Sequence, residues 1–426
     1  MTQKAMSKPY HMDLYESYLT EFKKYQQIMW VGIALYGIGA AFASTFATGM
    51  IKLIQLFEAI GLLGFAYAII NMIQFRLKSS LLNIFLFLYL AWSVFIILHG
   101  YEYTYQSTKS IFFSGVFQYF LPIILFIPKN LNFYKNISNI IVVYCIAFVF
   151  LNILYSDLVF AHYDENVNQK FTFEGFTQNL GIVAPFVLLT YIYHDKYKNW
   201  IAFSVTAFIF AVATYKARRG VMALSFVYLM LFLLIFYIYS NRKVLVFVIF
   251  AFILFFVGMN AENIYRQASG SFLEELQRRG AEDTRSGVEN AFKRDFEPVD
   301  WIIGRGINGE YWCPNVDMGN TTGYRFMIET DYLNIILKGG IIQLALMIII
   351  ALPAAFKALF YSNNLFSKVA GIWIIIWILC LYPLNVFNMD LNHILFWISV
   401  SIGYSQDLRR IPDEQIINDF KGSSSN

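Results

Sequence analysis

The sequence predicts an all-α, polytopic membrane protein with about twelve transmembrane helices, and three observations support that fold class. Hydrophobic residues make up 58% of the chain and charged residues only 14%, which is more apolar surface than a soluble chain of 426 residues can bury. Apolar runs of about 20 residues, the length that one bilayer crossing needs, recur along most of the sequence. Lysine and arginine gather in alternate loops between these runs.

The apolar runs set the order of the expected elements. Residues 1–27 are polar and show no cleavable signal, so the first helix is expected to anchor the chain. Helices are predicted at 28–48, 53–75, 81–99, 110–127, 137–155, 179–194, 199–214, 220–240, 244–260, 333–356, 368–383 and 391–405. The resulting plan is a cytoplasmic segment 1–27, nine helices in 28–260, a periplasmic loop domain 261–332, three helices in 333–405 and a cytoplasmic tail 406–426.

Basic residues predict the orientation of the chain. They precede the first helix and follow the second, fourth, sixth, eighth, tenth and last. Loops rich in lysine and arginine stay in the cytoplasm, so both termini are expected there. The loops around 100–109, 156–178 and 261–332 should then face outward.

One outward turn departs from this rule. The stretch "YKARRG", Tyr215 to Gly220, places Lys216, Arg218 and Arg219 between two apolar runs at the predicted outer face. Such side chains often extend to lipid headgroups, which would be a purely structural role. The alternative is an anion site, because two adjacent guanidinium groups and a helix start suit phosphate or pyrophosphate.

The long outer loop carries signals for two short helices and a glycine-rich turn. Ser271 with Glu274 and Ser286 with Glu289 have capping-box spacing, and Gly280 and Pro298 are the expected stops. The loop is therefore expected to form a cap domain. The glycines at 304, 306 and 309 resemble a phosphate-binding loop, but without a preceding strand and a following helix a tight turn is the better interpretation.

Charged residues gather where this loop enters the tenth helix. Arg325, Glu329 and Asp331 lie within seven residues of one another at its predicted outer end. The carboxylates could simply complement the helix dipole. Their proximity to several arginines favours a catalytic role instead.

Other classes of function find little support. Cys145, Cys313 and Cys380 lack metal-ligand spacing, no Walker-type loop appears, and a net charge of +4 gives no indication of nucleic-acid binding. Neither a metal nor a cofactor is expected.

Four stretches resemble the O-antigen polymerase and ligase superfamily of bacterial inner-membrane proteins. They are "FTFEGFTQNLGIVAPF", "KARRGVMAL", "TRSGVENAFKRDFEPVDWIIGRGINGEY" and "ETDYLNIILKGGII", and they occur in the family's order. Gly175, Asn179, Arg219 and Gly220 match the family's places. Glu329 stands where ligases and many polymerases have histidine, and Gln343 replaces a later glycine, so a polymerase is favoured over a ligase.

The resemblance implies a C-type glycosyltransferase fold, independent of metal, that polymerises polyprenyl-pyrophosphate-linked oligosaccharide into O-antigen, capsule or exopolysaccharide. Membrane lipids, a flippase and a chain-length regulator are the implied partners. Cations would stabilise the departing pyrophosphate and a carboxylate would accept the proton of the attacking hydroxyl. The expected pyrophosphate-binding residues are Arg218, Arg219, Arg325 and Arg305; the expected bases are Glu329 first and Asp331 second; further candidates are Glu174, Asn179, Arg285, Asp390 and His393.

Several alternatives stay open. The outward histidines His162 and His393 are more often structural than catalytic. A ligase that moves finished polymer to lipid A-core or protein belongs to the same superfamily. A flippase or other transporter is disfavoured because no internal repeat appears and ionisable residues gather at the outer face, although Lys52 and Glu58 are partial exceptions.

Overall fold

The computed structural model describes residues 10–45, 50–75, 79–100, 104, 115–160, 172–216, 218–240, 243, 286–314 and 322–422, with side chains from Glu21 onward. These residues are mostly helical. Six of their helices are long and apolar enough to cross a membrane: α1 (Tyr10–Ala43), α2 (Ile51–Met72), α3 (Ser80–His99), α6 (Leu131–Leu154), α11 (Arg219–Tyr239) and α16 (Asp331–Phe360). An all-α membrane protein is thereby confirmed, whereas twelve crossings stay a prediction. The expected helix 244–260 lies outside the described residues.

Two predicted helices are wrong as continuous elements. The range 179–194 is divided into the π-helix η4 (Thr177–Gly181), α9 (Ala184–Leu189) and the 3-10 helix η5 (Tyr191–Tyr193), after the short α8 (Thr172–Phe176). Pro185 lacks an N–H, and the side chains of Asn179 and Thr190 bond to the carbonyls of Gly175 and Phe186 one turn back. These features weaken a regular ladder of backbone hydrogen bonds, which apolar composition alone does not reveal.

The range 110–127 is also interrupted. The described helix α5 (Val116–Phe120) tightens into the 3-10 helix η2 (Leu121–Phe126) at Pro122, whose missing N–H breaks the α-helical pattern. The other described helices outside the cap are α7 (Ser156–Phe160), α10 (Lys196–Tyr215), α17 (Leu365–Cys380), α18 (Leu391–Tyr404), α19 (Gln406–Arg410) and α20 (Asp413–Gly422).

Helix α16 is longer than the predicted 333–356 and is bent rather than straight. Gly340 has φ 67° and ψ −178°, far from helical values, and divides the helix. A Cβ on Gly340 would lie 2.0 Å from the carbonyl oxygen of Ile302, so only glycine allows this backbone approach. The bend therefore marks the place where the chain at Ile302 and Ile303 crosses the helix.

Residues 286–314 and 322–330 form a cap with a small apolar core. It contains α14 (Ser286–Asp295), α15 (Pro298–Ile303) and an antiparallel pair, β1 (Tyr311–Trp312) with β2 (Tyr324–Arg325). Phe292, Phe296 and Tyr311 pack on one another and on the first turns of α16. The helix that the sequence predicts from Ser286 is present as α14 and ends at Asp295, three residues before Pro298. Pro298 begins α15, where its missing N–H costs nothing. The helix expected from Ser271 lies outside the described residues.

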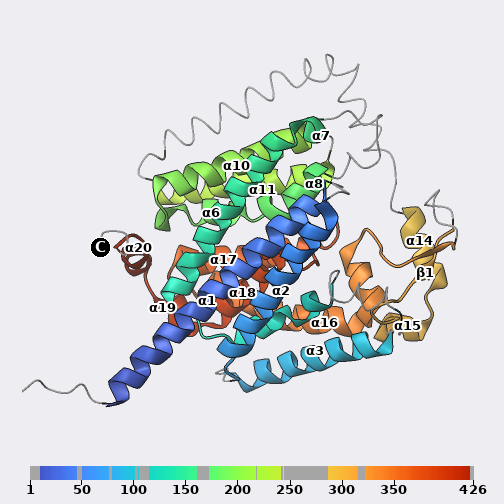
Figure 1. The fold of residues 1–426 in the computed structure, drawn as a ribbon, viewed down its shortest axis with the longest axis horizontal. Coiled ribbons are helices and arrows are strands. Elements are labelled where there is room, and N and C mark those ends of the chain that lie inside the picture. The colour runs from blue at the N-terminus through green and yellow to red at the C-terminus, as the bar shows by residue number, and fades with distance from the viewer. Residues whose placement is uncertain are drawn as a thin grey trace, which may run out of the picture.

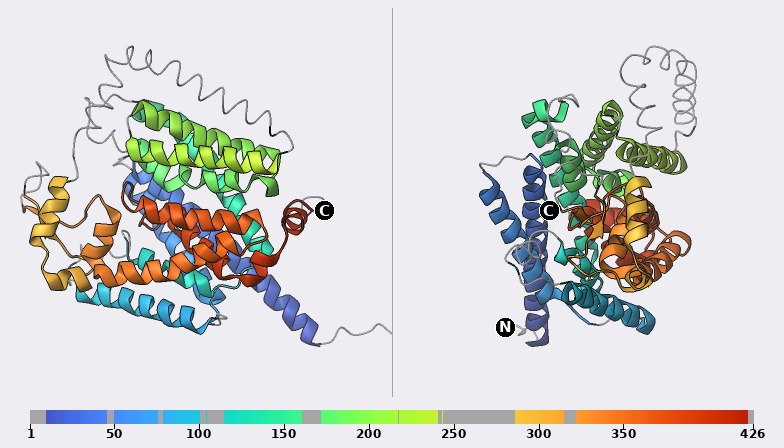
Figure 2. Two further views of the ribbon diagram at one scale, coloured as in Figure 1. Left: turned by 180° about the vertical axis from the view of Figure 1, so that it is seen from behind. Right: turned by 90° about the vertical axis from the view of Figure 1, so that its right-hand side faces the viewer.

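The described chain ends lie at one end of the molecule and the cap lies at the other (Figure 1). The start of α1 lies at the lower left and α20 at the left, whereas α14, α15 and β1 lie at the right. The view from behind shows the same separation (Figure 2). Both described chain ends are thus opposite the cap, as the alternation of basic loops requires. Which end faces the cytoplasm stays a prediction.

Candidate functional site

The structure brings together two of the predicted site residues from different loops. Arg218 precedes α11, and its Nε lies 2.7 Å from Oε1 of Glu174 on α8, with each side chain about one-fifth exposed. Helix α8 is held there by a close approach to α1, because a Cβ on Gly175 would lie 2.2 Å from Cβ of Ser44. The short helix α8, anchored by the buried Phe173 and Phe176, therefore brings the carboxylate of Glu174 to the basic turn.

The other cations of the turn behave differently from Arg218. The Lys216 side chain is buried. Burial lowers its pKa, the positive Arg218 lowers it further, and Glu174 opposes both. Arg219 is exposed and makes no hydrogen bond or ion pair with the described residues. The turn thus offers one buried cation, one paired guanidinium and one guanidinium available to a ligand.

Gly220 fixes what the basic turn packs against. A Cβ at this position would lie 2.9 Å from the Pro383 carbonyl oxygen and from Cδ2 of Leu384. Both residues belong to residues 381–390, here named the recessed segment, which joins α17 to α18. The glycine of the "RRG" sequence is therefore required by a close contact with a distant part of the chain.

The recessed segment joins two short apolar helices and is largely buried. Helices α17 and α18 have 16 and 14 residues, so they span about 24 Å and about 21 Å, less than the roughly 30 Å hydrocarbon core. Buried irregular backbone must find hydrogen-bond partners within the protein. A buried polar region is expected around it for this reason.

Asp331 supplies those partners. Its Oδ2 accepts hydrogen bonds from the backbone N–H of Val386 and from that of Phe387, the latter at 2.7 Å, and its side chain is almost fully buried. Leu384, against Gly220, is two residues from Val386, which is at most roughly 7 Å of chain. The recessed segment therefore connects the basic turn on one side with Asp331 on the other.

Asp390 ends the recessed segment and caps α18, accepting from the N–H of His393 at 2.8 Å. It lies within electrostatic range of Asp331, and of Tyr36 on α1 and Tyr144 on α6. Tyr36 is in turn an electrostatic neighbour of Glu58 on α2. Nothing in the sequence singles out either tyrosine. The signal for a buried polar region here is the ionisable Glu58 inside an apolar run.

His393 lies inside the protein. It is fully buried, its Nε2 accepts from Trp397 Nε1 at 3.1 Å, and its Nδ1 therefore donates to the carbonyl of Asn388 at 3.0 Å. Its ring also stacks on Trp377. The histidine supports the recessed segment, which is the structural role that the sequence favoured.

The remaining candidates lie in or beside the cap. Arg305 donates to the carboxylates of Asp300 and Asp295 and to the Glu310 carbonyl. Burial by itself would lower the pKa of Arg305, but the two carboxylates raise it above its ordinary value. Its guanidinium is therefore committed to the cap. Arg325, on β2, is half-buried, and Arg285 and His162 lie outside the described residues.

Glu329 stands just before α16 and differs from Asp331 in burial and in hydrogen bonding. It is exposed and makes no hydrogen bond or ion pair with the described residues. Only Thr330 separates it from Asp331 in the chain. A carboxylate open to a substrate thus stands next to one that holds backbone.

The Gly-x-Gly sequence forms a backbone crossing. The N–H groups of Arg305 and Gly306 donate to the carbonyls of Leu337 and Lys338, and that of Ile307 donates to Ile96. These donors are used within the protein, so they cannot cradle a phosphate. Gly304 has φ 73° and Gly306 has φ 78°, which fits the tight turn that the sequence favoured.

No family model, no curated protein and no solved structure matches the chain. Among the residues that the structure describes, no cluster of three or more metal-ligating side chains occurs.

Proposed function

We propose that the protein joins polyprenyl-pyrophosphate-linked oligosaccharide repeat units into a surface polysaccharide, at the outer face of a bacterial inner membrane. The observation that supports this most is the convergence of the "RRG" turn and the start of α16 on the recessed segment. Cations for a pyrophosphate and carboxylates for a proton then meet at one end of a membrane-embedded bundle, beside the cap.

The reaction needs no external energy source. A hydroxyl at the non-reducing end of one glycan attacks the anomeric carbon of the other, and its proton passes to a carboxylate. A new glycosidic C–O bond forms as the bond from the anomeric carbon to the pyrophosphate oxygen breaks. Polyprenyl pyrophosphate leaves with the bonding electron pair, so negative charge accumulates on its oxygens.

The basic turn suits that leaving group. Arg219 is available to contact it directly, and Arg218 is oriented by Glu174 at 2.7 Å. Preorganised cations of this kind stabilise developing charge without first having to reorganise. Losing one such donor typically costs about 2.7–4 kcal/mol of barrier, or roughly 10²–10³ in rate.

Glu329 is assigned the proton acceptor. Asp331 has one oxygen committed to two backbone N–H groups, and its loss would release the recessed segment. Glu329 has no such commitment among the described residues and is exposed. Asp331 is therefore assigned a positioning role.

A transporter is the second candidate, and a specific observation favours it. Glu58 and Asp331 belong to helices long and apolar enough to cross a membrane, Asp390 caps the apolar helix α18, and the bundle contains a broken helix at 177–193 and a bent one at Gly340. Interrupted helices with intramembrane charges are typical of transporters.

Gene deletion in the host separates these functions. Loss of a polymerase should leave lipid A-core carrying a single repeat unit on a gel of surface polysaccharide. Polymer that accumulates on the lipid carrier with none attached to core would indicate a ligase. Repeat units retained on the cytoplasmic side would indicate a transporter.

Point variants test the site directly. Purified Arg219→Ala should polymerise lipid-linked repeat units about 10²–10³-fold more slowly than wild type. Arg294→Ala is the matched control, since it also removes an exposed arginine, from cap helix α14. Equal activity of both variants with wild type would refute the assignment of the basic turn.

A further inference from the structure

A second polar feature lies at the opposite end of the molecule from the cap. A cavity of about 660 Å³ opens where α16 ends and α19 begins. Three cations line it, Lys357, Arg409 and Arg410, together with the polar side chains of Ser362, Asn363 and Gln406. No acidic residue is among the lining residues that the structure describes, so the cavity has a net positive charge.

Lys357, Arg409 and Arg410 form no ion pair with a carboxylate of the described residues. Lys357 lies over the ring of Tyr404, with Nζ 4.7 Å from the ring centroid. The nearby Asp413 accepts hydrogen bonds from the Tyr193 hydroxyl and from the N–H of Leu365. The positive charge of the cavity therefore suits an anionic ligand.

Arg409 has a structural role of its own. Its Nη1 donates to the carbonyl of Tyr361 at 2.7 Å, just past the end of α16. A cation at a helix C-terminus is stabilising, so this contact alone explains the residue. Lys357 and Arg410 lack such a bond to the end of the helix, which makes them the better candidates for a ligand.

An apolar stripe leads from the cavity along α16. Ile349, Leu352, Phe356 and Phe360 are spaced by three, four and four residues, so they share one helix face. All four are between 43% and 69% exposed, and they belong to a helix able to cross a membrane. The stripe is where acyl chains would lie if a headgroup occupied the cavity.

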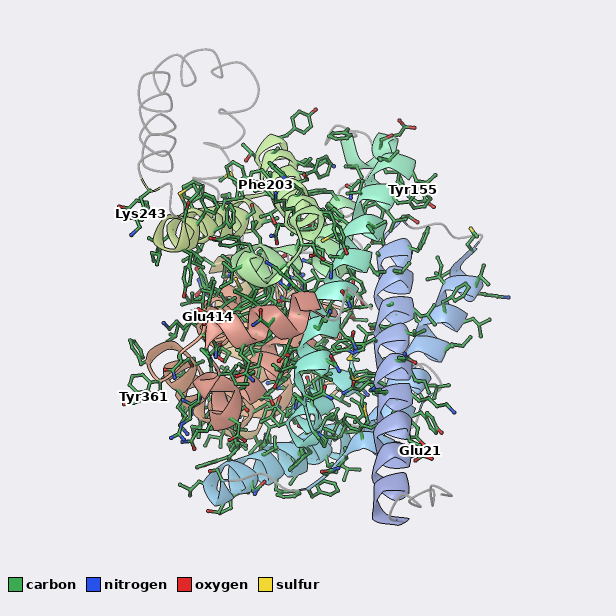
Figure 3. All side chains as sticks on the ribbon, turned by 90° about the vertical axis from the view of Figure 1, so that its left-hand side faces the viewer. Glu21, Tyr155, Phe203, Lys243, Tyr361 and Glu414 are labelled. Atoms are coloured by element: carbon green, nitrogen blue, oxygen red, sulfur yellow. The ribbon has the colours of Figure 1, made fainter. Side chains whose placement is uncertain are left out.

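Aromatic residues mark the level of the cavity. Tyr361 is 63% exposed, next to Phe360, and Figure 3 shows it at the edge of the molecule in the view onto the end that carries the termini. Tyrosine at the end of a spanning helix is typical of the membrane–water interface. The cavity is thus at headgroup height, with cations inside and an apolar wall toward the bilayer.

We propose that this cavity binds the phosphate headgroup of an anionic phospholipid, with the acyl chains lying along the stripe of α16. A free phosphate would satisfy the cations but would leave the stripe unexplained. By the alternation of basic loops, the lipid belongs to the cytoplasmic leaflet. This inference does not rest on the proposed polymerase activity.

The test uses the purified full-length protein in detergent, with bound lipid counted by native mass spectrometry. Phosphatidylglycerol, phosphatidylcholine and inorganic phosphate are titrated separately. Each cation near a membrane surface contributes about fivefold in affinity, so the double variant Lys357→Ala/Arg410→Ala should bind phosphatidylglycerol about 25-fold more weakly. Phosphatidylcholine binding should be unchanged.

Two controls make the result specific. Lys24→Ala removes an exposed lysine from α1, at the same end of the molecule and outside the cavity, and should change nothing. Lys357→Arg/Arg410→Lys keeps both charges and should retain the preference. Equal binding of the two lipids by wild type would overturn the proposal, as would a preference that survives the alanine double variant. Inorganic phosphate that binds as tightly as phosphatidylglycerol would also overturn it, because the acyl chains would then contribute nothing to the affinity.

Discussion

Two substitutions of Asp331 test whether this residue positions the recessed segment while Glu329 accepts the proton. Its Oδ2 accepts from the N–H groups of Val386 and Phe387, both on residues that are only 1% exposed. Alanine would leave two buried donors without an acceptor. Each costs about 1–3 kcal/mol, so Asp331→Ala should lower the free energy of unfolding by about 2–6 kcal/mol.

Asparagine changes the charge but keeps an acceptor. The side-chain oxygen of Asp331→Asn can still accept from both N–H groups, so the recessed segment should stay in place and the unfolding temperature should fall only slightly. A proton acceptor cannot be replaced in this way. If Glu329 is the base, Glu329→Gln should lose about 10²–10⁴ in rate, whereas Asp331→Asn should keep most of the activity.

The assay pairs two measurements on each purified variant. Thermal unfolding in detergent reports whether the recessed segment is intact, and turnover of a lipid-linked repeat unit reports activity. Asp331→Asn that unfolds like wild type but is as inactive as Glu329→Gln would refute the assignment and make Asp331 the base. Asp331→Ala with unchanged stability would refute the hydrogen-bond argument itself.

Three further outcomes follow from the packing and charges. Gly340→Ala should lower the unfolding temperature markedly, because its Cβ would lie 2.0 Å from the Ile302 carbonyl oxygen. The control is Gly287→Ala, because a Cβ at Gly287 has no atom within 4 Å. Lys216→Ala should slow polymerisation far less than Arg219→Ala in the same turnover assay, since Lys216 is buried and Arg219 is exposed. Lys216→Met should raise the unfolding temperature at pH 7. Burial and Arg218 lower the folded pKa of Lys216, so the cost of its charge is full below that pKa and disappears toward the ordinary value of 10.5. The gain measured by thermal unfolding should therefore shrink as the pH rises toward 10.5, and a constant gain would contradict this account.

Gly304, Gly306 and Gly340 show which backbone features the local sequence predicts and which it does not. The Gly304–Gly306 turn was predictable as a tight turn from its composition, but the carbonyls of Leu337 and Lys338 that occupy its N–H groups lie on another element. Gly340 appeared as an ordinary member of an apolar helix. Its positive φ arises because the chain at Ile302 and Ile303 crosses the helix at that point.

The sequence by itself determined the features that depend on one helix at a time. The apolar runs gave the class of protein and placed most helices, and the boundary of α11 beside Arg219 and Gly220 follows from local composition. Apolar length and loop charge act through the bilayer, which every segment meets separately. They need no knowledge of which helices are neighbours.

Only the tertiary structure decided how the candidate residues are used. Glu174 meets Arg218 because α8 packs on the end of α1, and Asp331 bonds to backbone 55 residues away because the segment that joins α17 to α18 packs beside the start of α16. Glu329 and Asp331 at the start of α16 and Asp390 at the start of α18 look alike in sequence, because each is a carboxylate beside an apolar helix. Burial separates them, since a carboxylate that satisfies buried N–H groups is held by the fold, whereas exposed Glu329 is open to a substrate.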